Sequence, residues 1–108
     1  MKKYDAIIIG AGHNGLTNAT YLAKAGLNTL VIEKNDYIGG AAVTRELHEG
    51  WFYSNCSYVC SMMRQSIHRD LNLTKHGLIL VPYLGTVTFG DSGDTISAYH
   101  SEGPYYNE

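Results

Sequence analysis

The sequence has no excess of charge of either sign and no long apolar run. Its 8 Lys and Arg residues stand against 10 Asp and Glu residues, a formal net charge of −2 at pH 7. This balance gives no electrostatic footprint for nucleic acid. No apolar stretch approaches the roughly eighteen residues of a transmembrane helix. Because the first apolar run starts close to Met1, we expect no cleavable targeting segment. We expect a cytoplasmic protein; the alternatives are a membrane-peripheral protein and a mitochondrial one whose presequence is missing.

Cysteine is also scarce, and its spacing excludes the common metal sites. Cys56 and Cys60 are separated by three residues. His48 and His68 do not stand at zinc-site spacing from them, so no metal site is predicted. If residues 57–63 are helical, the two cysteines share a face, and we expect buried thiols in a reducing compartment. The sequence also has no Ser/His/Asp signature, no carboxylate pair at acid/base spacing and no P-loop, so no catalytic residue is predicted.

A glycine-rich turn, Gly10-Ala11-Gly12-His13-Asn14-Gly15, follows directly after an apolar run at residues 6–9. Gly10 permits a tight turn off a strand, Gly12 lets the backbone approach a pyrophosphate, and Gly15 lets a helix pack closely on the sheet. The N-terminus of that helix offers N–H groups and the positive end of its dipole to a phosphate. The pattern predicts a dinucleotide-binding βαβ unit; the alternative is a glycine-rich turn in a ligand-free α/β domain.

The helix of this unit is visible as an apolar stripe. Leu16, Ala19, Leu22 and Ala23 recur at helical spacing, and Gly26 supplies the stop signal.

A second apolar run, residues 30–32, ends at Glu33. An acid is expected at this point of a dinucleotide-binding unit, about 20 residues beyond the glycine turn. Its carboxylate can accept hydrogen bonds from a ribose diol and repel a 2′-phosphate. Strand, turn, helix, strand and terminal acid thus occur in the order that the binding mechanism requires.

A second glycine pair, Gly39-Gly40, follows Glu33 closely. An NAD domain has no need for exposed backbone here, whereas the pyrophosphate and ribityl chain of FAD pass this loop, where a side chain would collide with them. An ordinary turn is the alternative for the pair alone, but the two glycine motifs together favour FAD. The residues that we expect to contact FAD are Gly10, Gly12, His13, Asn14, Gly15, Glu33, Lys34, Gly39, Gly40 and Ala41.

Four segments, GAGHNGL, VIEK, YIGGAAVTRE and GWFYSNCSYVCS, resemble the N-terminus of the phytoene desaturase-like flavoprotein oxidoreductases. The resemblance covers at least residues 4–82. It implies an α/β, Rossmann-like FAD-binding fold, with the first three glycines at the pyrophosphate, Glu33 at the adenosine ribose and Gly39-Gly40 beside the ribityl phosphate. It also implies hydride transfer from an apolar, polyene-like substrate to FAD. The alternatives are an amine-oxidising or NAD(P)H-using flavoprotein and a non-catalytic remnant.

The chain departs from related flavoproteins after the second glycine pair. In the wider amine oxidase and desaturase superfamily an arginine commonly follows the pair and meets the pyrophosphate, but Ala41 stands there in this sequence. Arg45 could reach back from the next helical turn; a surface salt bridge with Glu49 is the alternative. Flavin disulphide reductases place a redox pair directly after the glycines, so Cys56 and Cys60 lie too far along the chain to be that pair.

The rest of the sequence predicts short elements and an incomplete domain. We expect a helix or turn at residues 43–49, an aromatic segment covering the domain at 51–53, a helix at 65–73, a strand at 78–81 and a β-hairpin of 86–89 with 95–99. Residues 102–108 show no apolar periodicity. We expect residues 1–108 to be a partial FAD-binding domain, the N-terminal piece of a longer oxidoreductase or a truncated product, without a substrate domain. The expected ligands are FAD and, in the longer parent, an apolar small molecule.

Overall fold

The computed structural model describes residues 2–99, and the expectation for residues 102–108 lies outside them. The chain divides into two units, one ending at Leu78 and the other beginning at Ile79. Each unit is described here by itself.

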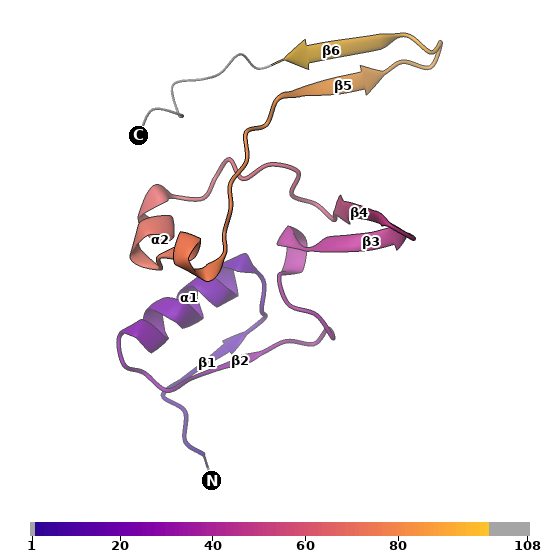
Figure 1. Cartoon of the computed structure of the whole chain (residues 1–108). Helices are drawn as coiled ribbons and strands as arrows, with labels where there is room; N and C mark the ends of the chain where they lie inside the picture. The colour runs from indigo at the N-terminus through magenta and orange to yellow at the C-terminus, as the bar shows by residue number, and fades with distance from the viewer. Residues whose placement is uncertain (1, 100–108) are drawn as a thin grey trace. The chain divides into compact units, whose positions relative to one another are not determined.

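The first unit contains the predicted βαβ arrangement, which is confirmed. It consists of β1 (Ala6–Ile9), α1 (His13–Lys24) and β2 (Thr29–Ile32), and β1 pairs with β2 in parallel (Figure 1). The ladder continues one residue beyond β1, because the Gly10 N–H donates to the Ile32 carbonyl at 2.7 Å. The carboxyl ends of both strands therefore meet where the glycine turn begins.

Helix α1 packs on the two strands through the apolar stripe that the sequence predicts. Ala19 is buried, Leu16 and Leu22 are half-buried, and Ala23 is exposed at the edge of the stripe. The helix ends at Lys24, and the expected stop residue Gly26 follows it with a left-handed φ of +91° and an N–H that donates to the Ala23 carbonyl at 2.9 Å. Glycine adopts this conformation without the penalty that a Cβ brings.

The face of the β1–β2 pair that points away from α1 is uncovered. Side chains alternate between the two faces along a strand, and Ile7 and Ile9 of β1 are 57% and 87% exposed, while Ile32 of β2 is 48% exposed. Parallel strands in folded proteins are normally covered on both faces. The described residues thus bury one side of this pair and leave the other side open.

Most of the segment 43–49 forms a strand rather than the expected helix or turn. The short 3-10 helix η1 (Gly40–Ala42) leads into β3 (Thr44–His48), which pairs antiparallel with β4 (Trp51–Ser54). The aromatic residues of β4 favour strand pairing over a local helix, and Gly50, at φ +78°, forms the turn.

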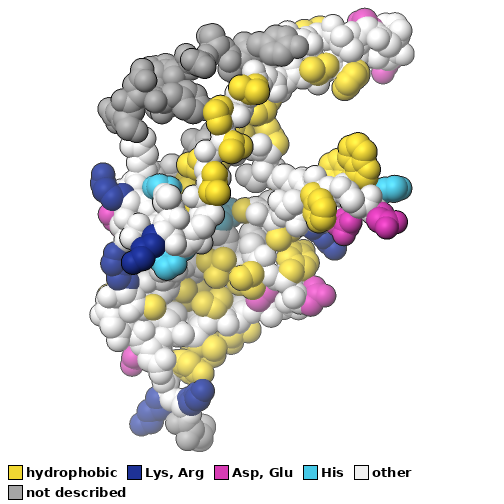
Figure 2. Space-filling view, viewed as in Figure 1, with side chains coloured by type: hydrophobic (Ala, Val, Ile, Leu, Met, Phe, Trp, Pro, Cys, Tyr) yellow, Lys and Arg dark blue, Asp and Glu magenta, His cyan; other side chains and the backbone are white. Residues whose placement is uncertain are grey.

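The aromatic segment does not cover the domain. Trp51 and Phe52 are 62% and 67% exposed, and Figure 2 shows hydrophobic side chains along this hairpin next to acidic ones.

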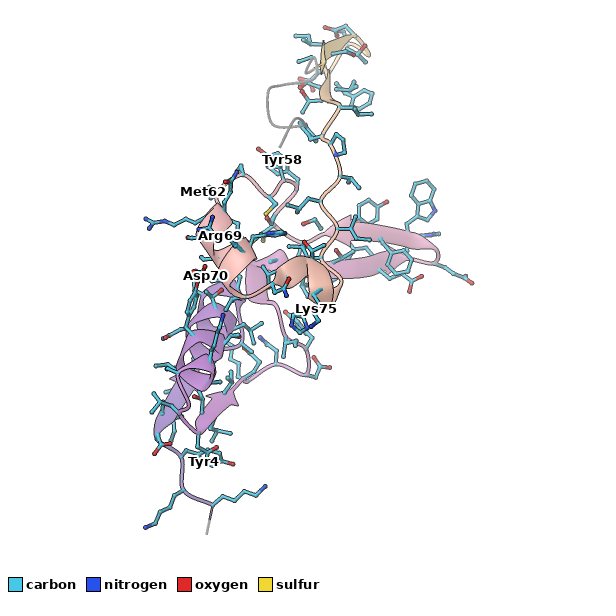
Figure 3. All side chains as sticks on the ribbon, turned by 60° about the vertical axis from the view of Figure 1, so that its left-hand side comes forward. Tyr4, Tyr58, Met62, Arg69, Asp70 and Lys75 are labelled. Carbon is cyan, nitrogen blue, oxygen red and sulfur yellow. The ribbon has the colours of Figure 1, made fainter. Side chains whose placement is uncertain are left out.

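The predicted helix at 65–73 is confirmed with shorter bounds, as α2 (Gln65–Asp70). A separate 3-10 turn, η2 (Leu73–His76), follows because Asn72 adopts a left-handed φ of +51°. Two side chains of α1 hold α2: the Tyr21 hydroxyl donates to the Asp70 carboxylate at 3.0 Å, and the Lys24 ammonium donates to the Asp70 carbonyl. Asp70 is labelled in Figure 3.

Residues 57–63 do not form the helix on which a shared face for Cys56 and Cys60 was conditional, and the predicted strand at residues 78–81 is wrong. The latter segment is apolar, but Ile79 and Val81 are 80% and 79% exposed and have no strand partner among residues 2–99. A strand needs a neighbour for its backbone groups, which local sequence does not specify.

The second unit contains the predicted β-hairpin, which is confirmed. It consists of β5 (Gly85–Phe89) and β6 (Thr95–Tyr99), with Phe89 opposite Thr95. Its turn is closed by the Gly90 N–H, which donates to the Asp94 carbonyl at 2.8 Å.

Candidate functional site

The glycine turn allows α1 to start against the end of β1. A Cβ added at Gly15 would lie 2.1 Å from the Gly10 carbonyl oxygen and 3.5 Å from the Ile8 side chain. No side chain fits at Gly15, so α1 can start this close to the Gly10 carbonyl only with glycine at position 15. Gly10 has a left-handed φ of +98°, which lets the chain turn off the strand.

The N-terminus of α1 has no side-chain cap and no acidic residue in its first turn. Gly12 is the N-cap, in extended conformation, and its carbonyl accepts the Leu16 N–H at 2.9 Å. His13 and Asn14 occupy the first turn with exposed side chains. The first N–H groups of a helix have no intrahelical acceptors, and the helix dipole places partial positive charge there. This end of α1 therefore suits an anion.

The second glycine pair lies directly against the first glycine turn. The Gly39 N–H donates to the Ala11 carbonyl at 2.8 Å, and Gly39 forms a parallel β-bridge with Gly12. A Cβ added at Gly40 would lie 3.0 Å from the Gly12 Cα. Gly39 and Gly40 have left-handed φ values of +116° and +59°. The protein's own backbone thus favours glycine at position 40, a reason that the sequence analysis did not find.

Glu33 lies at the end of β2 and bonds to the same turn. Its Oε2 accepts the Ala11 N–H at 2.7 Å, and its Oε1 accepts the backbone N–H of Asn35 at 3.0 Å and the Asn35 side-chain amide at 2.9 Å. The backbone hydrogen bonds from Asn35 and then Ala11 lower the pKa of the Glu33 carboxyl below its ordinary value. The side chain is therefore an anionic acceptor at neutral pH.

Ala11 and Asn35 are site residues that sequence reasoning missed. Ala11 is only 2% exposed, and it joins Glu33 through its N–H and Gly39 through its carbonyl. Its place between two glycines indicated only a small residue. Asn35 stands two positions after the acid, a spacing at which short polar side chains often bond locally.

The remaining predicted contacts lie at the edge of this cluster. Lys34 and Ala41 are exposed. Arg45 lies on β3 rather than on a helical turn, and its guanidinium stacks over the Tyr37 ring, 5.3 Å from the centroid. In the part of the chain that the structure describes, Arg45 forms no salt bridge with Glu49. The argument from helical spacing was therefore wrong, and a contact between Arg45 and FAD stays a prediction.

The cysteines are not buried, contrary to expectation. Cys56 and Cys60 are free and exposed, and residues 57–63 form no helix that would place them on one face. Among residues 2–99, no three His, Cys, Asp or Glu side chains gather as a metal site would require. Within the same residues, no helix is long and apolar enough to cross a membrane.

Residues 8–71 match the model of the NAD(P)-binding Rossmann-like domain family. The chain belongs to this family. It is 54% identical over 78 residues to pyridine nucleotide-disulfide oxidoreductase domain-containing protein 2 of Rattus norvegicus, covering 72% of this chain and 13% of the relative. It is 34% identical over 92 residues to phytoene desaturase of Neurospora crassa, covering 85% of this chain and 12% of the relative.

A solved structure adds a match at the level of fold. Wild-type putrescine oxidase bound to putrescine superposes with a TM-score of 0.61 and 29% identity, over 94% of this chain and 22% of that protein. These findings confirm the expected resemblance to the N-terminal part of phytoene desaturase-like oxidoreductases. The chain spans about an eighth of the length of the curated relatives named here.

Proposed function

We propose that this chain forms the N-terminal part of the FAD-binding domain of a flavin-dependent oxidoreductase related to phytoene desaturases. One observation carries the proposal: the N-terminus of α1, the Gly39-Gly40 pair and the Glu33 carboxylate meet at a single residue, Ala11. A helix N-terminus suits a pyrophosphate. An acid at the end of the second strand suits a ribose diol.

The backbone at the turn leaves room for a phosphate group. A Cβ added at Gly10 would meet nothing within 4 Å, and one added at Gly12 would meet only the Gly40 Cα at 3.9 Å. Because neither glycine has a side chain, a ligand can approach this backbone. The proposal assigns the pyrophosphate to Gly10, Gly12 and the first turn of α1, where His13 and Asn14 lie.

The proposal assigns the adenosine ribose to the Glu33 carboxylate. Its Oε1 accepts two Asn35 N–H groups, whereas its Oε2 accepts the Ala11 N–H, and the Lys34 backbone also bonds to the carboxylate. A ribose hydroxyl would share the carboxylate with these donors. A 2′-phosphate would place a second anion beside this carboxylate, so the proposal disfavours an NADP-type adenosine.

The proposed reaction is oxidation of an apolar small molecule, with FAD, when bound, accepting the hydride. The chain's part is to hold the adenosine ribose and pyrophosphate, and thereby to orient the cofactor. The substrate domain would come from a longer protein, which the greater length of the relatives supports. The similarity to putrescine oxidase favours an amine-oxidising flavoprotein as the second candidate.

Nuclear magnetic resonance titration of the 108-residue chain with ADP tests the binding assignment. We expect ADP to shift the backbone amides of residues 10–15 and of Glu33. Adenosine is the matched control because it lacks phosphate, and it should leave the Gly12 and His13 amides nearly unchanged. If millimolar ADP also leaves these two amides unshifted, the assignment is wrong.

A further inference from the structure

We infer that Glu33 positions the glycine turn through the Ala11 amide, so that pyrophosphate binding depends on Glu33 even for a ligand without ribose hydroxyls. This inference rests on the proposed function and extends it. In the simpler view, the acid acts only on the ribose. The two views predict opposite effects on the affinity for a ligand without ribose hydroxyls when the Glu33 carboxylate is removed.

The first argument is the environment of the Ala11 amide. Ala11 as a residue is 2% exposed, and its N–H donates to the Glu33 Oε2 at 2.7 Å in a part-buried hydrogen bond. A buried backbone N–H almost always has a partner, because leaving it without one costs about as much as a lost hydrogen bond. Removing the carboxylate would therefore force the turn to move or to admit water. The partner is 22 positions away in sequence, so the bond ties the glycine turn to the end of β2.

The second argument is that Ala11 connects the parts of the proposed pyrophosphate site. Its carbonyl accepts the Gly39 N–H at 2.8 Å, and the next residue, Gly12, is the N-cap of α1. A displacement of Ala11 would shift both Gly12 and the Gly39 segment. Binding groups must be held to within about 0.5 Å of the productive geometry. The bond from Glu33 therefore holds the backbone that faces the phosphates.

The third argument is that the two carboxylate oxygens have separate partners. Asn35 binds Oε1 through its backbone and side-chain N–H groups, and Ala11 binds Oε2. The Asn35 bonds fix the orientation of the carboxylate, and that orientation directs Oε2 at the turn. These bonds hold the Glu33 carboxylate in place without a bound ribose, which a positioning residue requires.

The experiment compares ADP with 2′,3′-dideoxy-ADP, which has no ribose hydroxyls, on the 108-residue chain and its E33A variant. We expect E33A to weaken binding of both ligands, that of dideoxy-ADP by about three- to tenfold, the size of one ordinary intramolecular hydrogen bond. If Glu33 acted only on the ribose, E33A would bind dideoxy-ADP equally or more tightly, because an anionic ligand loses a repulsive neighbour. Unchanged or tighter dideoxy-ADP binding therefore overturns the inference.

The control variant is D36A, which removes a nearby exposed negative charge. It should bind dideoxy-ADP equally or slightly more tightly than the unmodified chain, which measures the effect of charge alone.

Hydrogen exchange of the Ala11 amide provides a readout that needs no ligand. E33A should accelerate exchange at Ala11 while exchange at Ile8, within β1, stays unchanged. If E33A unfolds the chain, E33Q decides, because its neutral carbonyl gives a weaker acceptor of the same size. Ala11 should then exchange faster than in the unmodified chain, and an unchanged rate overturns the inference. If the unmodified chain binds neither ligand, the exchange rates decide the positioning role, and the cofactor released from the native protein containing this sequence decides the proposed function.

Discussion

Replacing Gly40 with Ala perturbs the contact between the two glycine motifs. The new Cβ would lie 3.0 Å from the Gly12 Cα, and residue 40 has a φ of +59°. The left-handed conformation alone costs a non-glycine residue about 1–2 kcal/mol. The Gly12 backbone must in addition move by a few tenths of an ångström to relieve the contact. We therefore expect G40A to destabilise the fold by more than the conformational penalty and also to weaken ADP binding.

G50A is the matched control for this prediction. Gly50 has a similar left-handed φ of +78°, but a Cβ there would meet nothing within 4 Å. G50A should therefore lose about 1–2 kcal/mol of stability for its backbone conformation and bind ADP as the unmodified chain does. Urea unfolding measures the stability of the two variants, and titration followed by resonance shifts at Gly12 measures their ADP affinity. Equal ADP affinities for G40A and G50A would refute the reasoning that Gly40 holds Gly12 in place.

Three further predictions follow from the same geometry. G15A should prevent the native start of α1, because its Cβ would lie 2.1 Å from the Gly10 carbonyl oxygen; a native-like amide spectrum would contradict this. The Glu33 pKa lies below its ordinary 4.5, so its stabilising bonds should be intact above pH 4.5 and be lost as the pH falls through the lowered pKa, which the Ala11 amide shift would report. Replacing Cys56 and Cys60 with Ser should leave flavin reduction by substrate in the native protein near its normal rate, and lost reduction with FAD still bound would show a redox role.

The βαβ unit was predictable because its signals are local and mutually consistent. The apolar run before Gly10 specifies β1, the helical stripe specifies α1, and Gly26 marks where that helix has stopped. The structure has these features in this order. The hairpin of β5 and β6 was predictable for the same reason, since two strand-like runs flank a turn rich in glycine and aspartate.

The interior of the site was not predictable from spacing. The bond from Glu33 to Ala11 and the contact of Gly40 with Gly12 join segments that are distant in sequence, and neither residue pair has a local signature. The strand within residues 43–49 was not predictable, because its formation depends on pairing with β4. Cys56 was expected to be buried if residues 57–63 were helical, and the structure has neither the helix nor the burial.

The protein's own backbone already accounts for a preference for glycine at position 40, so the glycine pair alone does not distinguish FAD from NAD. The identity of the bound dinucleotide is therefore the most direct test of the proposed function. The native protein containing this sequence should be purified, its cofactor released by heat and the released compound identified by mass spectrometry. We predict FAD. Recovery of a nicotinamide dinucleotide with no flavin would contradict the account.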